Sequence, residues 1–353
     1  MEWVRAHTPF TEASLEGLSS KHRARLAVRF HIDLKMVPVI EGLAEHLELL
    51  VFPCSSVTTD QQGWGYLESA GGVRLEPVWR ARLAREFLGG GGFLCDLGGE
   101  MVAAAVCEDW PIQAALEGTT SGVRVIEKAL QESTAPFPIF DWNAAPLKLQ
   151  LHNEKMVGFS LWQTFTEVTR LSLHSKRVGV LGFGPVGRGI ARTARSLGGQ
   201  VAVYDPSFEA GLVAEYEGFS CLKRSDLLSR SDVLVTATGR DGVLALGDLA
   251  CLPSGAFLLN AGHSEKELAG EIRAHSGWKP VLENVEKLER PDGSHIYLLA
   301  RGQLLNLAAG FGDTINAFDL TSAQLVSAIR FMLENFGSVQ PGFVPLRGDF
   351  FHS

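Results

Sequence analysis

The chain has 353 residues, of which 46% are hydrophobic, so it is long enough to form two domains. Its 40 acidic side chains outnumber its 32 basic ones and give a formal net charge of −8. This balance argues against a nucleic-acid partner and against an anionic membrane surface. No apolar run approaches the roughly 18 residues that span a bilayer. The five scattered cysteines lack metal-ligand spacing, so we expect reduced thiols, no metal and a cytoplasmic protein.

The first half of the chain predicts a helix over 37–47 and strands over 48–52 and 92–95. Polar or glycine residues follow each strand, at 55–60 and 96–100. Ligands of open parallel sheets bind beyond the carboxyl ends of the strands. We therefore expect these two loops to form walls of a site.

The second half continues the alternation of short apolar strands and helical stretches. We predict helices over 160–175 and 187–197, strands over 178–181, 201–204, 232–236, 256–260 and 296–299, and a short strand at 281. An amphipathic helix follows over 321–336, with Thr321 or Asp319 as its N-cap. The pattern predicts an α/β fold of two domains. Their predicted bounds are 1–158 for a substrate domain, 159–311 for an inserted Rossmann domain, and 312–353 for a helix and tail that pack back on the first domain or on a partner subunit.

The most informative stretch is a strand, a glycine turn and a helix start at 177–187, with the spacing G-x-G-x-x-G. A second strand then ends in an acid. Together these are the dinucleotide fingerprint: the glycines allow a tight turn, close approach of a pyrophosphate and close packing of the helix on the strand. The acid would accept hydrogen bonds from ribose hydroxyls and favours NAD over its phosphorylated form. The residues that carry this prediction are Gly182, Gly184, Pro185, Val186, Gly187 and Asp205.

The segment G-F-G-P-V-G-R-G at 182–189 resembles the G-Y-G-D-V-G-K-G signature of the S-adenosylhomocysteine hydrolases. Further similar segments occur in the family's order, over about residues 25 to 340. They are His31, D-L-G-G-E at 96–100, E-G-T-T-S-G-V at 117–123, T-A-T-G at 236–239, N-A-G-H at 260–263 and L-L-A-R-G-Q-L-L-N-L at 298–307.

This resemblance implies a tightly held NAD that oxidises a nucleoside 3′-hydroxyl to a ketone, which acidifies the neighbouring C4′ hydrogen. Loss of that proton expels the 5′ substituent, water adds, and the ketone is reduced again. It places Thr119, Thr120, Ser121, Thr238, Asn260 and Asn306 in the cofactor pocket. It places His31, Asp96 and His263 on the substrate side, with a lysine and an acid nearby. Between 143 and 158 the chain is two residues longer than the family, so counting from the two ends gives Lys148 or Gln150 as the lysine position, with Glu154 as the acid.

Several departures fall on the substrate side. Leu97 replaces a family aspartate, Gly118 replaces a glutamate, and Asp313 stands where the family's lid has a histidine. The chain also ends at Ser353, before the family's long C-terminal arm, so we expect a homodimer or homotetramer whose subunits do not complete each other's NAD pockets. The predicted activity is elimination on a nucleoside-like substrate. It ends either in dehydration to a 4′,5′-unsaturated nucleoside, as suits a biosynthetic enzyme, or in hydrolysis of a variant thioether. The alternative is a catalytically silent NAD-binding regulator.

Overall fold

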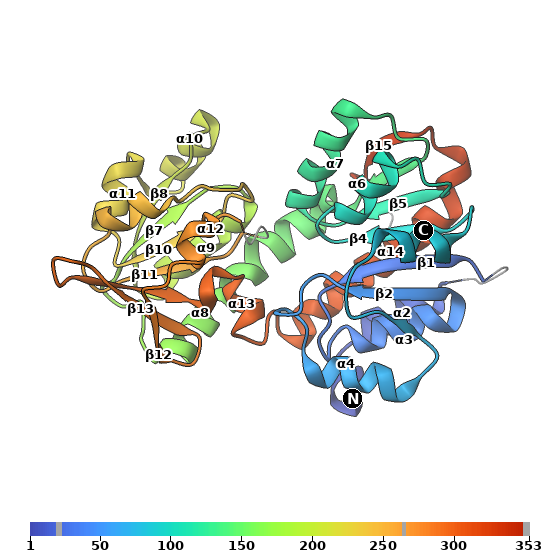
Figure 1. The fold of residues 1–353 in the computed structure, drawn as a ribbon, viewed down its shortest axis with the longest axis horizontal. Helices are drawn as coiled ribbons and strands as arrows, with labels where there is room; N and C mark the ends of the chain where they lie inside the picture. The colour runs from blue at the N-terminus through green and yellow to red at the C-terminus, as the bar shows by residue number, and fades with distance from the viewer. Residues whose placement is uncertain (19–22, 263–265, 349–353) are drawn as a thin grey trace. The chain divides into compact units, whose positions relative to one another are not determined.

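The chain folds into two compact units, as seen in a computed structural model that describes residues 1–18, 23–262 and 266–348 (Figure 1). Unit 1 comprises Met1–Lys148 and Ile315–Ser353, and unit 2 comprises Leu149–Thr314. Unit 2 is thus inserted between the two segments of unit 1. The predicted fold class, α/β with an inserted Rossmann domain, is confirmed.

Unit 1 contains a sheet of seven strands among its described residues, in the order β15-β6-β5-β4-β1-β2-β3, all parallel. The strands are β1 (Arg25–Phe30), β2 (Glu48–Pro53), β3 (Arg74–Leu75), β4 (Phe93–Asp96), β5 (Ala114–Glu117), β6 (Pro138–Asp141) and β15 (Gly342–Pro345). The helices are α1 (Glu2–Ala6), α2 (Pro9–Glu16), α3 (Val37–His46), α4 (Gln61–Ala70), α5 (Ala81–Leu88), α6 (Glu100–Cys107), α7 (Thr120–Glu132) and α14 (Ile315–Asn335), with 3₁₀ turns η1 (Trp142–Ala144) and η5 (Phe336–Ser338).

Helices bury both faces of this sheet, and the side chains of each strand point alternately to the two faces. In β1, Leu26, Val28 and Phe30 face a core shared with α3 and α14, whereas Ala27 faces a second core shared with α5 and α6. Parallel strands covered on both faces are buried along their length, and β1 and β2 are buried at every position after the first.

Unit 2 contains a sheet of eight strands among its described residues, in the order β12-β13-β14-β11-β10-β7-β8-β9. The strands are β7 (Arg177–Leu181), β8 (Gln200–Tyr204), β9 (Ser220–Cys221), β10 (Val233–Thr236), β11 (Ala256–Asn260), β12 (Trp278–Leu282), β13 (Val285–Glu289) and β14 (His295–Leu299). The helices are the π-helix η2 (Lys148–Met156), α8 (Val157–Thr169), α9 (Pro185–Ser196), α10 (Phe208–Tyr216), α11 (Arg224–Arg230), α12 (Gly270–Arg273) and α13 (Leu305–Ala308), with 3₁₀ turns η3 (Leu246–Cys251) and η4 (Ala300–Gly302).

This second sheet is likewise covered by helices on both faces. Val178, Val180 and Val235 pack against α8 and α9 on one face. Leu234 and Leu258 pack against α11 and η3 on the other. Strand β13 pairs antiparallel with β14, and β12 pairs antiparallel with β13, so the parallel part of the sheet ends at β14.

Helices α3 and α9 lie within two residues of their predicted bounds, and two other helices differ more. The amphipathic helix predicted over 321–336 begins six residues earlier, as α14, so Asp319 and Thr321 are not its N-caps. Asp319 is instead buried inside α14, where it accepts hydrogen bonds from the backbone N–H groups of Phe10 (3.1 Å) and Thr11 (2.7 Å) at the start of α2. It therefore caps a different helix, distant in sequence (Figure 1). The helix predicted over 160–175 ends at Thr169 as α8, and η2 precedes it.

None of the described helices is both long and apolar enough to cross a membrane. All five cysteines are free thiols.

Candidate functional site

The glycine turn of unit 2 lies between β7 and α9, at the point in the sheet where the strand order reverses. Gly182 has a φ of +97°, and a Cβ there would lie 2.6 Å from the Ala237 carbonyl oxygen. A Cβ on Gly187 would lie 1.9 Å from the Gly182 oxygen, so this position packs the helix onto the turn. A Cβ on Gly184 would meet nothing within 4 Å. Gly184 therefore leaves open space at the N-terminus of α9, where a pyrophosphate binds in this fold.

Asp205 directly follows β8, the strand beside β7. Its carboxylate accepts hydrogen bonds from the backbone N–H groups of Phe183 (2.7 Å) and Ser207 (2.8 Å). Each carboxylate oxygen can accept more than one hydrogen bond. Asp205 thus stands at the glycine turn with acceptor capacity for ribose hydroxyls, and the residues present fit the adenosine half of NAD.

A polar network joins the carboxyl ends of β10 and β11. The Asn260 side chain accepts from the Thr236 hydroxyl (3.2 Å) and donates to the Gly302 carbonyl (3.1 Å). Glu267, which the sequence analysis did not predict as a site residue, is fully buried and accepts from the backbone N–H groups of Thr238 and Gly239. Burial raises the pKa of its carboxyl group, and these hydrogen bonds oppose the rise. No local sequence pattern indicates that the glutamate at position 267 is buried next to the predicted cofactor residues.

The segment around η2 and α13 brings further predicted residues together in unit 2. The Asn306 amide donates to the Ser160 hydroxyl (3.2 Å), which also donates to Asp313 (3.2 Å). Asp313 in turn lies 3.0 Å from Nδ1 of His152. The Glu154 carboxylate accepts from Arg188 and Arg192 of α9, each at 3.1 Å.

Unit 1 has its own reversal point, because β1 lies between β2 and β4. His31 follows β1, and its Nδ1 lies 2.7 Å from the Thr58 hydroxyl in the loop after β2. Asp96 ends β4 and is fully buried, where its Oδ2 accepts from the Met101 (2.7 Å) and Val102 (3.3 Å) N–H groups at the start of α6.

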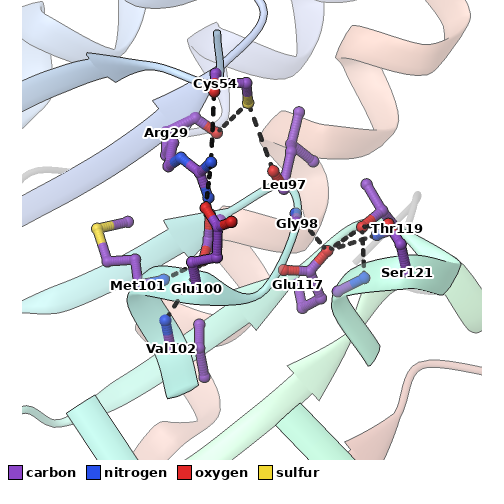
Figure 2. Close-up of polar contacts among 12 residues, drawn as sticks. Arg29, Cys54, Leu97, Gly98, Glu100, Met101, Val102, Glu117, Thr119 and Ser121 are labelled. Atoms are coloured by element: carbon purple, nitrogen blue, oxygen red, sulfur yellow. Dashed lines mark hydrogen bonds and ion pairs between the residues drawn. The ribbon is translucent and has the colours of Figure 1, made fainter. Parts of the chain in front are cut away.

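A charged cluster, buried except for Glu100, extends from this point along the strand ends (Figure 2). Arg29 of β1 pairs with Glu100 and lies 3.6 Å from Asp96. Glu117, at the end of β5, accepts from the Gly98 N–H (3.2 Å) and from the N–H and hydroxyl of Thr119 (both 2.7 Å). Burial raises the pKa of Glu117 well above its usual range, and nearby Asp96 adds to the rise. Burial also raises the pKa of Asp96, but Arg29 and the hydrogen bonds from Met101 and Val102 oppose that rise.

The predicted cofactor residues 119–121 form the start of α7 in unit 1. The Thr119 hydroxyl accepts from the Gly122 N–H (3.0 Å) and caps the helix. The Thr120 hydroxyl accepts from the Asn143 amide (3.1 Å). Ser121 lies 3.3 Å from the Thr119 hydroxyl.

Positions 97 and 118, where the resemblance to the family places carboxylates, hold Leu97 and Gly118 beside the Trp142 ring. A Cβ on Gly118 would lie 2.6 Å from the Trp142 ring and 2.7 Å from Leu97. A glutamate cannot occupy position 118 unless Trp142 moves. The Lys148 ammonium lies 4.9 Å from the centre of the same Trp142 ring, a cation–π contact.

The predicted site residues thus divide between the units. His31, Asp96, Lys148 and the stretch 119–121 belong to unit 1, and the glycine turn, Asp205, Thr238, Asn260, Asn306 and Glu154 belong to unit 2. His263 lies outside the described residues.

Comparisons with known proteins agree with this geometry. The family model "S-adenosyl-L-homocysteine hydrolase, NAD binding domain" matches residues 156–312. An S-inosyl-L-homocysteine hydrolase from Methanopyrus kandleri is 28% identical over 97% of this chain and 85% of its own. An adenosylhomocysteinase from Thermotoga maritima is 31% identical over 75% of this chain and 67% of its own. Among solved structures, a dipicolinate synthase chain from Bacillus halodurans covers 87% of this chain and 99% of its own, with 14% identity and a TM-score of 0.48.

The fold and the glycine turn define an NAD-binding Rossmann protein. The similarity to curated relatives goes further: the chain belongs to the S-adenosyl-L-homocysteine hydrolase family, and NAD is its cofactor. The predicted family and cofactor are both confirmed.

Proposed function

We propose that this protein is an NAD-dependent enzyme that eliminates the 5′ substituent of a nucleoside-like compound through transient oxidation of a sugar hydroxyl. The relatives from Methanopyrus and Thermotoga are hydrolases of S-inosyl- and S-adenosyl-L-homocysteine by name. NAD bound at the glycine turn supplies the oxidation of the hydroxyl and its later reversal. The adjacent C–H bond then becomes acidic enough for a positioned base to remove its proton.

The elimination balances without another reagent. The C4′–H bond breaks and its electron pair forms the second bond between C4′ and C5′. The bond from C5′ to the leaving group breaks, and the leaving group takes that electron pair and a proton. When the leaving group is hydroxide, the product is a 4′,5′-unsaturated nucleoside and water. When it is a thiolate, addition of water to the double bond completes a hydrolysis.

We assign the leaving-group proton to His31, which Thr58 holds at the reversal point of the first sheet. Asp96 is buried and engaged with α6, so we propose that it positions the loop after β4. The hydroxyl proton would pass to a group on η2, the helix that bears Lys148 and Glu154. His263 completes the proposed set.

One observation carries the proposal of a changed substrate or outcome: Leu97, Gly118 and Trp142 form an apolar contact where the family has two carboxylates. Polar groups of the usual substrate would lose their hydrogen bonds there, which costs roughly 1–3 kcal/mol for each unpaired group. We therefore propose a substrate that differs from S-adenosyl-L-homocysteine in the part that meets this wall.

Incubation in D₂O with S-adenosyl-L-homocysteine, S-inosyl-L-homocysteine, adenosine and inosine tests the proposal. We expect at least one of the four compounds to gain deuterium at C4′, in the unreacted compound or in its hydrolysis product, or to be converted to the 4′,5′-unsaturated product. Loss of water from the product mass would identify a dehydratase, and exchange of the thioether for a hydroxyl would identify a hydrolase. A 4′,5′-unsaturated product has no hydrogen on C4′, so the product mass is needed beside the deuterium content. Absence of both deuterium at C4′ and any change of mass for all four compounds, with NAD bound, would contradict the proposal and favour the silent regulator.

A further inference from the structure

We propose that His152 and Asp313 form a histidine–carboxylate pair that accepts the proton of the oxidised sugar hydroxyl and later returns it. This inference rests on the proposed function and names the proton acceptor for its first step. The two side chains lie 3.0 Å apart, from Nδ1 of His152 to Oδ2 of Asp313, and both belong to unit 2. Asp313 occupies a position where the resemblance places a histidine.

The carboxylate of the pair is buried and anchored. Its side chain is 5% exposed, against 19% for His152. Its Oδ1 accepts from the Ser160 hydroxyl (3.2 Å), and Ser160 also accepts from the Asn306 amide (3.2 Å). Asn306 is a proposed cofactor residue, so the pair is connected to the cofactor pocket of the same unit. A hydroxyl that NAD oxidises must lie at that pocket.

The contact between Asp313 and Nδ1 of His152 determines which nitrogen of His152 can accept the sugar proton. A carboxylate beside Nδ1 holds the hydrogen on that nitrogen, so Nε2 carries the lone pair. The same carboxylate stabilises the imidazolium after Nε2 has taken up a proton. His152 can therefore act as a base and then as an acid, while Asp313 is a positioning residue.

The other proton acceptors on η2 are less suited to this step. Two guanidinium groups hold the Glu154 carboxylate and compete for its lone pairs. The Lys148 ammonium faces the Trp142 ring, a contact that favours the positive charge. A lysine must lose its proton before it can act as a base.

The backbone around His152 supports a functional role. π-helical segments are rare and often occur at functional sites. Here the nine-residue η2 lies where the chain is two residues longer than the family pattern, so the π-helix accommodates the insertion. A Cβ on Gly189 would lie 2.4 Å from the Glu154 carbonyl oxygen, which shows how closely η2 rests on α9. The segment that bears His152 is thereby packed, through Glu154, against the helix that follows the glycine turn.

The step balances as follows. The O–H bond of the sugar hydroxyl breaks, its proton goes to Nε2 of His152, and its electron pair becomes the second bond of the carbonyl group. NAD, when held by the glycine turn and Asp205, would accept the hydrogen on the same carbon together with its electron pair. The reverse transfers restore the hydroxyl, the neutral imidazole and NAD.

The test compares NAD-loaded His152→Gln and Asp313→Asn with the wild type and with His174→Gln, which changes an exposed histidine of the same unit. NAD content after denaturation shows whether the pocket is intact. The absorbance of reduced nicotinamide, followed after rapid mixing with each of the four compounds named above, gives the oxidation rate and the half-saturating concentration. ¹⁵N NMR of labelled histidine reports the His152 tautomer without any substrate.

We expect His152→Gln to keep its NAD and its half-saturating concentration but to oxidise the nucleoside roughly 10²–10⁴-fold more slowly. Asp313→Asn should slow oxidation and remove the Nδ1–H tautomer seen in the wild type, and His174→Gln should match the wild type. Full NAD content in His152→Gln with a rate within about threefold of wild type would overturn the pair, as would loss of NAD from that variant. If no compound reduces NAD in the wild type, the proposed function fails separately, and an Nε2–H tautomer of His152 would then overturn the pair.

Discussion

At the scale of single residues, three glycines with different surroundings separate folding from cofactor binding. A side chain at Gly187 collides with the Gly182 carbonyl oxygen, whereas one at Gly184 meets open space. At Gly184, no neighbouring protein atom requires the absence of a side chain. A close approach of the cofactor supplies a reason for the glycine.

Gly184→Ala should therefore bind NAD at least roughly tenfold more weakly, about 1.4 kcal/mol, while its melting temperature without nucleotide stays close to that of the wild type. Gly187→Ala should lose both stability, by about 1–3 kcal/mol, and NAD. Gly211→Ala, on an open face of α10, is the control: it should leave NAD affinity unchanged and raise stability by about 0.5–1 kcal/mol, as expected for alanine in a helix. Calorimetry and NAD titration measure the two quantities. Unchanged affinity in Gly184→Ala would show that the pyrophosphate lies elsewhere.

The buried carboxyl of Glu117 predicts a dependence of stability on pH. Its pKa is raised in the folded protein, so the folded chain retains a proton that the unfolded chain has released. Its contribution to stability is fully present below the unfolded pKa and is lost as the pH rises toward the folded pKa. Glu117→Gln keeps an acceptor for Thr119 and cannot ionise. Above the unfolded glutamate pKa of about 4.3, its unfolding free energy should fall less with rising pH than that of the wild type.

Urea denaturation at several pH values measures this difference, and Glu127→Gln on the exposed face of α7 is the control. Parallel pH profiles for Glu117→Gln and the control would contradict the retained proton.

At the scale of elements, the cap of α2 comes from another helix. Asp319 of α14 accepts from two backbone N–H groups of α2 and from the Thr11 hydroxyl (2.7 Å). Asp319→Ala leaves those buried donors unpaired and should destabilise unit 1 by about 1–3 kcal/mol. Asp319→Asn should lose less, because its amide oxygen still accepts. Chemical denaturation measures both variants, and equal stability of Asp319→Ala and wild type would refute the capping role.

The elements also show what local sequence can and cannot predict. Strands such as β7 and β11 were predicted within one residue because burial on both faces makes them apolar throughout. The β12–β13 hairpin was missed as a pair, because β12 is largely exposed and carries Lys279 and Pro280. The short strand β15 pairs with β6 from far along the chain, and η2 has no local signature. Helix α14 was predicted to start too late because the role of Asp319 depends on α2, which no local pattern reveals.

At the scale of the whole molecule, each unit has a sheet with its own reversal point: His31 and Asp96 lie at the first, and the glycine turn lies at the second. The glycine motif predicted the NAD turn because backbone geometry requires those residues at that spacing. The residues that interact through long-range contacts, Glu267 with Gly239 and His152 with Asp313, were not predicted as pairs. Their contacts join segments whose separation in sequence is irregular, so only the folded chain brings them together.

The central claim is that this chain holds NAD and uses it as an internal catalyst. The most direct measurement is the amount and redox state of nucleotide released by denaturation, before and during turnover of a nucleoside substrate without added NAD. We predict that NAD is released before substrate is added, that part of it is reduced during turnover, and that the total stays constant when the substrate is exhausted, with the oxidised form restored. Reduced nucleotide that accumulates in step with product, or turnover that requires added NAD as a consumed reagent, would contradict the claim.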